Sequence, residues 1–225
     1  MKSLFTVLIA LGTAVNLHAA SDEDAQRLKT AGEVLGEIES APDKSIPNDL
    51  LQKAQCAIVI PDMKKAGFIV SAKYGRGFAS CRKPGGGWSA PAGMRIEGGG
   101  FGLQAGGSAT DVVMLVMSKR GMDGLLASKF TLGGEASVAA GPVGRDTTAQ
   151  TDATMKADIL SWSRSKGVFG GVSLQGGTLR PDDDANKALY GDKVTNRDLL
   201  TGKVNKTVDF LTAKLSQYGG NAPLK

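Results

Sequence analysis

The sequence has 225 residues, a formal net charge of +5 and a single histidine, His18. Histidine triads, histidine general bases and most zinc sites need an imidazole, and two cysteines alone do not close a tetrahedral metal site. The composition therefore argues against an enzyme of ordinary hydrolase design, and we expect no metal and no cofactor. The 31 glycines are spread among apolar runs, which indicates a compact protein rich in turns and strands.

The first twenty residues have the features of a secretory signal peptide. Lys2 precedes an apolar run from Leu4 to Val15, and small residues end the segment before the acidic sequence SDED. The run is short for a membrane span, so an uncleaved membrane anchor is the less favoured alternative. We predict a signal peptide over residues 1–20, one mature domain over residues 21–225, and a periplasmic or secreted protein.

Amphipathic helices are predicted at both ends of the mature chain. Residues 24–39 repeat apolar side chains every three or four positions and begin with acidic residues, which favour the positive end of a helix dipole. Residues 198–217 show the same repeat, with lysines on the other faces. We expect the helix over residues 24–39 to pack against the body of the protein.

The stretch from Ala57 to Ser108 consists of short β-branched runs separated by proline and by glycines, among them Gly75 and Gly77, which we interpret as turn residues that end strands. Its first runs, residues 58–60, 68–72 and 78–81, are too short for helices, and we expect an antiparallel meander. Further strands are expected over residues 130–132, 136–140, 159–163 and 168–174. The predicted fold class is α+β, with a strand-rich antiparallel sheet or barrel-like core and helices at the N-terminal and C-terminal ends.

The two cysteines fall at opposite ends of this meander. Cys56 is at the start of its first strand and Cys81 is at the end of its third strand, so folding could bring them side by side. Cysteines in an oxidising compartment are usually paired, and we predict one disulfide. Two buried thiols remain the alternative, because strand register cannot be read from the sequence.

Basic residues are concentrated in the middle of the chain. The formal net charge is −5 over residues 21–62, +7 over residues 63–145 and +2 over residues 146–225. This pattern favours an anionic partner, and a merely solvated surface is the alternative. The candidate contact residues are those expected in or beside turns: Lys64, Lys65, Lys73, Arg76, Arg82 and Lys83, with Arg164 and Lys166 as a second group.

Three patterns resemble catalytic or binding motifs but fit them poorly. Residues 98–107 imitate a dinucleotide fingerprint, but a buried strand follows where a helix is required. Asp182 and its neighbours match the first ligands of a calcium loop, but Lys187 stands where the loop needs glycine, and an aspartate helix cap explains the same residues. Glu97, Asp111 and Glu135 could serve an enzyme that acts on glycans, but nothing places two of them in one cleft.

Six ordered sequence blocks resemble the SYLF domain family over roughly Pro47 to Gly191. They read IPDMKKAGF, GRGFASCR, WSAPAGMRIEGGGFGLQAGGSATDVVMLVM, FTLGGEASVAAGPVGR, SWSRSKGVFGGVSLQGGTL and ALYG. The resemblance implies a small mixed fold rich in strands, no catalytic activity and recognition of anionic membrane surfaces. Eukaryotic members bind phosphoinositides and, in fungi, actin filaments, and many exported bacterial members are described as lipid-binding.

Two departures limit what the resemblance implies for this chain. Eukaryotic members use a basic amphipathic N-terminal segment for lipid contact, whereas residues 24–39 are acidic here. Trp162 stands where the family usually has tyrosine. The expected function is an exported lipid-binding protein that recognises anionic phospholipid or phosphoinositide head groups. The alternative is an envelope adaptor for a protein or polymer partner, and nucleic acid is not expected because the basic region contains no recognised motif.

Overall fold

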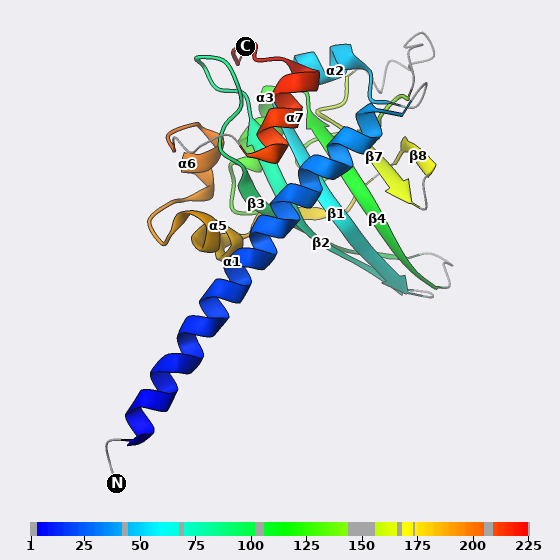
Figure 1. Ribbon diagram of the computed structural model, residues 1–225. Helices are drawn as coiled ribbons and strands as arrows, with labels where there is room; N and C mark the ends of the chain where they lie inside the picture. Colours follow the sequence, from blue (N-terminus) through cyan, green and yellow to red (C-terminus); the bar gives the residue numbers. More distant parts are fainter. Residues whose placement is uncertain are drawn as a thin grey trace.

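The computed structural model describes residues 4–41, 45–67, 70–101, 106–143, 156–165, 168–172, 174–204 and 209–224. Figure 1 shows its helices and strands. In chain order they are α1 (Leu4–Glu39), α2 (Asn48–Lys53), β1 (Cys56–Gly67), β2 (Val70–Cys81), β3 (Ala92–Phe101), β4 (Gly106–Val116), α3 (Lys119–Leu125), β5 (Phe130–Thr131), β6 (Val138–Ala140), β7 (Ile159–Ser165), β8 (Val168–Gly171), β9 (Thr178–Pro181), α5 (Asp183–Tyr190), α6 (Asn196–Leu200) and α7 (Phe210–Gly219).

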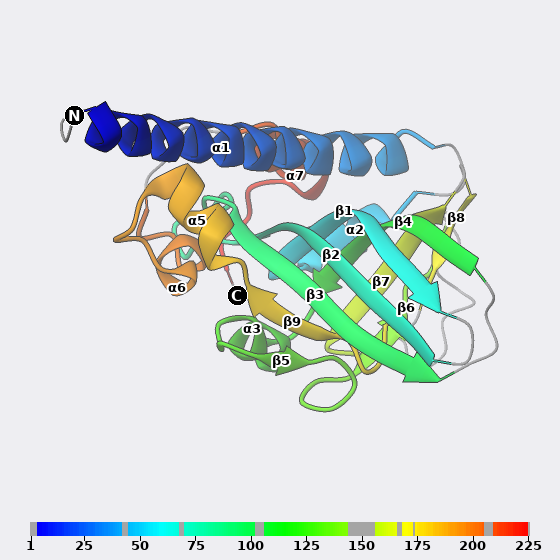
Figure 2. The ribbon, with the colours of Figure 1, turned by 90° about the horizontal axis from the view of Figure 1, so that it is seen from below.

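The described strands form one sheet in the order β5-β9-β3-β2-β1-β4-β7-β6, and β8 pairs with β7. Among the described residues, every pairing between these strands is antiparallel except the parallel pair of β6 with β7. The sheet is curled, and α1 and α7 lie together against one of its faces (Figure 2). The predicted α+β class, with helices at both ends of the chain, is confirmed.

The three short strands predicted at the start of the sheet are two long ones. β1 and β2 have 12 residues each, and their register shifts between Val59 and Lys64. Gly75 and Gly77 lie opposite this irregularity, and they do not end a strand as predicted. A Cβ atom at Gly77 would lie 2.1 Å from the carbonyl oxygen of Val59, and one at Gly75 would lie 2.7 Å from Cγ2 of Ile60. These glycines therefore allow the bulged strand to approach closely.

The long antiparallel pair explains the disulfide. Cys56 and Cys81 are directly opposite in the register of β1 and β2, with their Cα atoms 3.9 Å apart. A bond joins their sulfur atoms. The predicted pairing is confirmed, and the adjacent strands supply the register that the sequence could not provide.

Each face of the sheet buries its own hydrophobic core. Successive side chains of a strand point to opposite faces. Val59 and Phe78 therefore pack with Leu35 of α1 on the face covered by α1, α2 and α7, whereas Ile58 and Ile60 belong to the core of the other face. Because β1 and β2 are apolar on both sides along this part, their sequences read as continuous hydrophobic runs.

The terminal helices agree only partly with the prediction. The predicted helix over residues 24–39 is the C-terminal part of α1, which begins earlier, at Leu4. The predicted helix over residues 198–217 is two helices, because α6 ends before Gly202, whose φ of +74° is not helical, and Asp209 caps the start of α7. No helix among the described residues is long and apolar enough to cross a membrane.

Candidate functional site

The basic residues predicted to form one surface lie in separate parts of the molecule. Lys64 and Lys65 lie inside β1, not in a turn, because that strand is longer than predicted. Their side chains point to opposite faces of the sheet. Lys65 is directly opposite Lys73 of β2, whose pKa is lowered by burial and by the charge of Lys65. Lys166 lies outside the described residues.

Arg82 lies beside a turn, as predicted, but it is buried, and the expectation that it presents its charge at the surface is wrong. Only 3% of the residue is exposed, its guanidinium stacks 4.4 Å from the ring centre of Trp88, and burial lowers its pKa. The guanidinium donates five hydrogen bonds of 2.7–3.2 Å to backbone carbonyls, of Leu51, Ala54, Gly219, Gly220 and Ala222. These carbonyls come from the C-terminal ends of α2 and α7 and the segment beyond α7. Helix C-termini carry partial negative charge, so Arg82 joins two of them.

Two more of the predicted contact residues take part in structural contacts. Arg164 of β7 donates to Asp111 Oδ2 from Nε at 3.0 Å and from Nη2 at 2.7 Å, and its third nitrogen contacts Glu37 of α1. Burial raises the pKa of Asp111. Lys83 is half-buried and exchanges backbone hydrogen bonds with Gly87 and Leu224. Both residues tie distant segments to the sheet.

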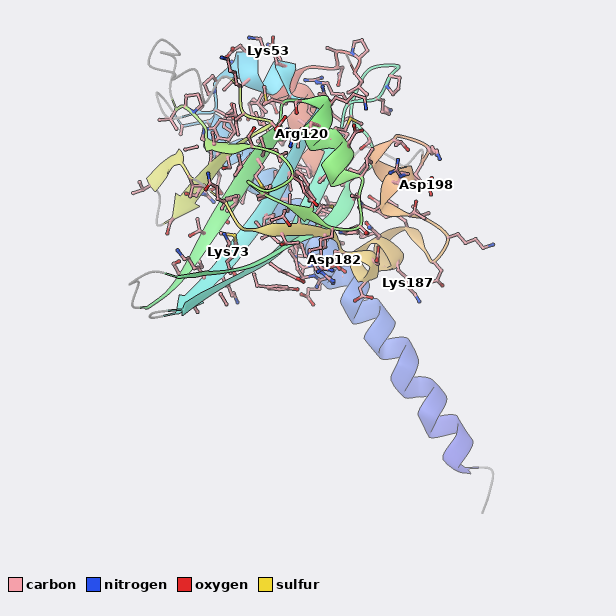
Figure 3. All side chains as sticks on the ribbon, turned by 180° about the vertical axis from the view of Figure 1, so that it is seen from behind. Lys53, Lys73, Arg120, Asp182, Lys187 and Asp198 are labelled. Atoms are coloured by element: carbon pink, nitrogen blue, oxygen red, sulfur yellow. A yellow bond between two sulfur atoms is a disulfide. The ribbon has the colours of Figure 1, made fainter. Side chains whose placement is uncertain are left out.

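Arg76 holds together three elements on the helix-covered face. Its Nε donates to Asp182 Oδ2 at 2.5 Å, and its Nη2 lies 3.4 Å from Asp24 Oδ1 on α1. Each aspartate is only 3% exposed. Burial raises the pKa of Asp24, and Arg76 and Arg27 oppose this rise. Asp182 also caps α5 by accepting a hydrogen bond from the backbone of Ala185, so the predicted aspartate cap of this helix is present and is Asp182. Figure 3 shows Asp182 where α1 passes the end of the sheet.

Two adjoining hollows flank Arg76. One, of about 610 Å³, lies between α1 and strands β1 and β2, and the other, of about 760 Å³, lies between α1, β2, β3 and α5. Glu23, Tyr74 and Arg76 line both. Tyr74 is 49% exposed, one of few large apolar side chains exposed in the described part of the chain. An exposed aromatic ring where two hollows meet is a feature of binding surfaces.

A row of three arginines crosses the sheet beside these hollows, and the sequence interpretation missed two of them. Arg76 of β2 is opposite Arg95 of β3, which is opposite Arg180 of β9. Glu97 lies 2.9 Å from Arg95 Nε and 3.6 Å from Arg180 Nε. The sequence signal that could have identified Arg95 is the alternation of polar and apolar residues in β3, because its neighbours Met94 and Ile96 are buried. No sequence pattern shows that the three arginines share a row.

The acidic residues considered for glycan chemistry do not meet. Glu97 lies on β3 and Asp111 on β4, with β2 and β1 between these strands in the sheet. Glu135 accepts a hydrogen bond from the backbone of Thr131. Each carboxylate thus has its own local partner, and the structure brings no two of these three into one site.

Comparison with known proteins identifies the family. A family profile named Ysc84 and described as "Las17-binding protein actin regulator" matches residues 97–218, from β3 to α7. The chain belongs to this Ysc84, or SYLF, family. The SH3 domain-containing YSC84-like protein 1 of Xenopus laevis is 33% identical over 191 residues, which are 84% of this chain and 56% of that protein. The LAS seventeen-binding protein 3 of Saccharomyces cerevisiae is 36% identical over 167 residues, 72% of this chain and 36% of that protein.

These relatives are named for what they bind or contain, and none of these names describes a reaction. The chain spans about half or less of the length of the curated relatives it matches. The shared family confirms the resemblance noted in the sequence blocks. Tyr74, Arg76 and Arg95 precede the part matched by the family profile, whereas Arg180 and the α5 side of the larger hollow lie within it.

Proposed function

We propose that this chain is a non-catalytic adaptor that binds a protein partner at the two hollows around Tyr74 and Arg76. The observation that carries the proposal is the half-exposed Tyr74 ring at the junction of the hollows. The names of the relatives support a protein partner, since the family is described as Las17-binding and as regulating actin. The N-terminal segment supports a partner outside the cytoplasm, because it has the features of a secretory signal.

The surroundings of Tyr74 favour a partner of protein size. Arg76 is held by Asp24 and Asp182, so the floor of both hollows is rigid and its charge is largely neutralised. A rigid surface with an exposed aromatic residue loses little conformational entropy when a partner binds. The hollows lie along α1, so an extended segment of a partner can follow the helix from one hollow into the other.

Photo-crosslinking tests this proposal. The full chain is produced in its native host with p-benzoylphenylalanine at Tyr74, and the matched control has the same amino acid at Val143, which is 40% exposed beyond β6. We expect a discrete adduct with one protein from position 74 that forms at high salt, and none from position 143. Equal adducts from both positions, or no adduct from position 74, would contradict the proposal.

An anionic membrane surface is a second candidate function. Lys64, Lys65 and Lys73 lie toward the same end of β1 and β2, and Val168 at the start of β8 is 69% exposed. β7 runs toward this end too, since Arg164 is opposite Asp111 in the middle of β4 and the Ser165 hydroxyl donates to the backbone carbonyl of Ala109. Each lysine near an anionic bilayer contributes about 1 kcal/mol, and an exposed valine can enter the interface.

Co-sedimentation with vesicles tests the membrane candidate. We expect the chain to bind vesicles of phosphatidylglycerol at low salt, to bind neutral phosphatidylcholine vesicles much less, and to lose binding when Lys64, Lys65 and Lys73 are changed to glutamate. The matched control reverses Lys53, Lys119 and Lys193, which are exposed elsewhere. Equal loss in both triple variants would mean that net charge, and not this end of the sheet, governs binding.

A further inference from the structure

We propose that Arg95 and Arg180 form a binding site for a carboxylate group, and that the ligand is an acidic segment of a protein partner. The inference rests on the proposed function in one respect only, namely that the partner is a protein. It adds the chemistry of the partner and a location, the pair of guanidinium groups on β3 and β9. Neither residue was among the basic residues predicted from the sequence to contact an anion.

The two guanidinium groups are neighbours that ought to repel each other. Arg95 and Arg180 are directly opposite in the register of β3 and β9, and Arg76 continues the same row on β2. Like charges at opposite positions of an antiparallel pair are destabilising. Glu97 is the one carboxylate that lies within ion-pair distance of both Arg95 and Arg180 among the described residues. One negative charge therefore offsets two positive charges, and the pair retains a net charge of +1.

Their hydrogen-bonding groups are largely unused, unlike those of the other arginines in the sheet. A guanidinium carries five N–H donors. Arg82 uses all of them, and Arg76 and Arg164 each contact two carboxylates. Arg95 and Arg180 approach Glu97 through Nε alone, and within the described residues no partner is seen for their terminal nitrogens. Their side chains are 36% and 38% exposed, so a ligand can reach these nitrogens.

Most negative charges near Arg95 and Arg180 are paired with cations of the protein, and on the β9 side of the pair a further cation can lie close by. Arg95 lines the larger hollow, whose acidic residues Glu23, Asp24, Asp182 and Asp192 are each within ion-pair distance of Arg27, Arg76 or Lys187. Asp184 has no ion pair among the described residues and opposes an anion there. On the other side, β5 pairs with β9 through Phe130 and Leu179. Extending that register by one residue brings the exposed Lys129 opposite Arg180.

The shape of the surface favours a peptide over a membrane. Arg95 lies in the larger hollow, whose walls are formed by α1 and α5. A flat bilayer would meet these helices before it reached the guanidinium, whereas an extended chain is narrow enough to enter. Guanidinium and carboxylate groups can join through two parallel hydrogen bonds, which are among the stronger ones in proteins. The terminal nitrogens of Arg95 and Arg180 together can hold one carboxylate from each side.

The test measures binding of a fluorescein-labelled deca-glutamate peptide to the full chain by anisotropy at low salt, with a deca-glutamine peptide as the neutral comparison. The test variant is Arg95→Gln with Arg180→Gln, and the matched control is Arg120→Gln with Lys119→Gln, which removes two exposed charges on α3. Figure 3 shows Arg120 well apart from Asp182 and Lys187. We expect at least tenfold weaker binding in the test variant, less than twofold change in the control, and tighter binding in Asp184→Asn.

Circular dichroism and thermal unfolding establish that each variant is folded. Equal weakening in the test and control variants, or no difference between the glutamate and glutamine peptides, would overturn the proposal. If the test variant loses binding to phosphatidylglycerol vesicles but not to the peptide, the pair recognises lipid phosphate and the carboxylate assignment is wrong. Crosslinking from Tyr74 separates this failure from that of the proposed function, because it does not depend on Arg95 or Arg180.

Discussion

Arg82 and the Arg95–Arg180 pair lie on or beside neighbouring strands, but they differ in burial and in how many of their hydrogen-bond donors the fold uses. Arg82 follows β2 directly, is 3% exposed, and gives every donor to a backbone carbonyl. Arg95 and Arg180 lie in the next two strands, remain more than one third exposed, and share a single carboxylate. The difference shows that a count of positive charges says little about binding. What matters is how many donors the fold itself uses.

The largest loss of stability should come from replacing Arg82, whose hydrogen-bond donors are all used within the fold. In Arg82→Met, five backbone carbonyl groups at or beyond the ends of α2 and α7 lose the guanidinium, and the bonds to Leu51, Ala54 and Gly219 are buried. We expect a loss of about 3–5 kcal/mol in the free energy of unfolding. Urea denaturation followed by circular dichroism measures it. Arg120→Met, an exposed arginine on α3, is the control and should change stability by less than about 0.5 kcal/mol. A small loss in Arg82→Met would show that water replaces the guanidinium.

Replacing Arg76, which pairs with two buried aspartates, should also destabilise the protein, by an amount that depends on pH. In Arg76→Met, Asp24 and Asp182 remain buried without their cation, and we expect a loss of about 3 kcal/mol at pH 8. The loss should be smaller at pH 4, because burial raises the pKa of Asp24 and protonation then removes its charge. Thermal unfolding at both pH values measures the difference, with Lys64→Met as the control. A loss independent of pH would mean that packing, and not charge, is what Arg76 provides.

Glu39 at the end of α1 is the opposite case, a half-buried charge with too few partners. Burial raises its pKa from 4.5 to about 7, and a backbone hydrogen bond with Ile46 only partly opposes this. Its Oε1 has no hydrogen-bond partner among the described residues. Because the folded state holds the proton more tightly, this contribution to stability is full below pH 4.5 and is lost as the pH rises through 7.

Glu39→Gln should therefore stabilise the protein at high pH. We expect a gain of about 1–2 kcal/mol at pH 8, less than the full shift implies because the group is only half-buried, and little change at pH 4. Melting temperatures measured across this range are the readout. Glu33→Gln, a partly exposed residue on the same helix that pairs with Lys29, is the control. A gain of equal size at both pH values would contradict the assigned ionisation.

The smallest effect on stability should come from changing Arg180, because the terminal nitrogens of Arg95 and Arg180 have no partner among the described residues. Arg180→Gln removes a repulsion with Arg95 and leaves Glu97 to Arg95, so we expect the free energy of unfolding to change by less than about 0.5 kcal/mol. Chemical denaturation checks this. Stability that is unchanged while binding is lost is the behaviour of a surface kept for function. A loss as large as that of Arg82→Met would place Arg180 among the structural arginines.

Local patterns predicted much of the architecture. The 3.6-residue repeat located residues 24–39 in a helix, and an aspartate cap was expected at the start of the helix that is α5. The prediction failed where glycine has more than one use. Gly75 and Gly77 were read as turn residues, whereas they lie within β2 opposite the bulge of β1. Without knowledge of the partner strand, a glycine that permits close approach looks the same as one that ends a strand.

The sequence by itself determined the family, the α+β class and the presence of helices near both ends, because these depend on local spacing and on ordered blocks of residues. The pairing of the two cysteines was predicted, and strand register brought them together. Only the tertiary structure decided which cations are used internally. Arg82 and Arg164 find their partners 28 to 140 positions away along the chain. Arg76, Arg95 and Arg180 become neighbours through strand pairing. Burial and pairing of charges are long-range properties, and no window of sequence contains them.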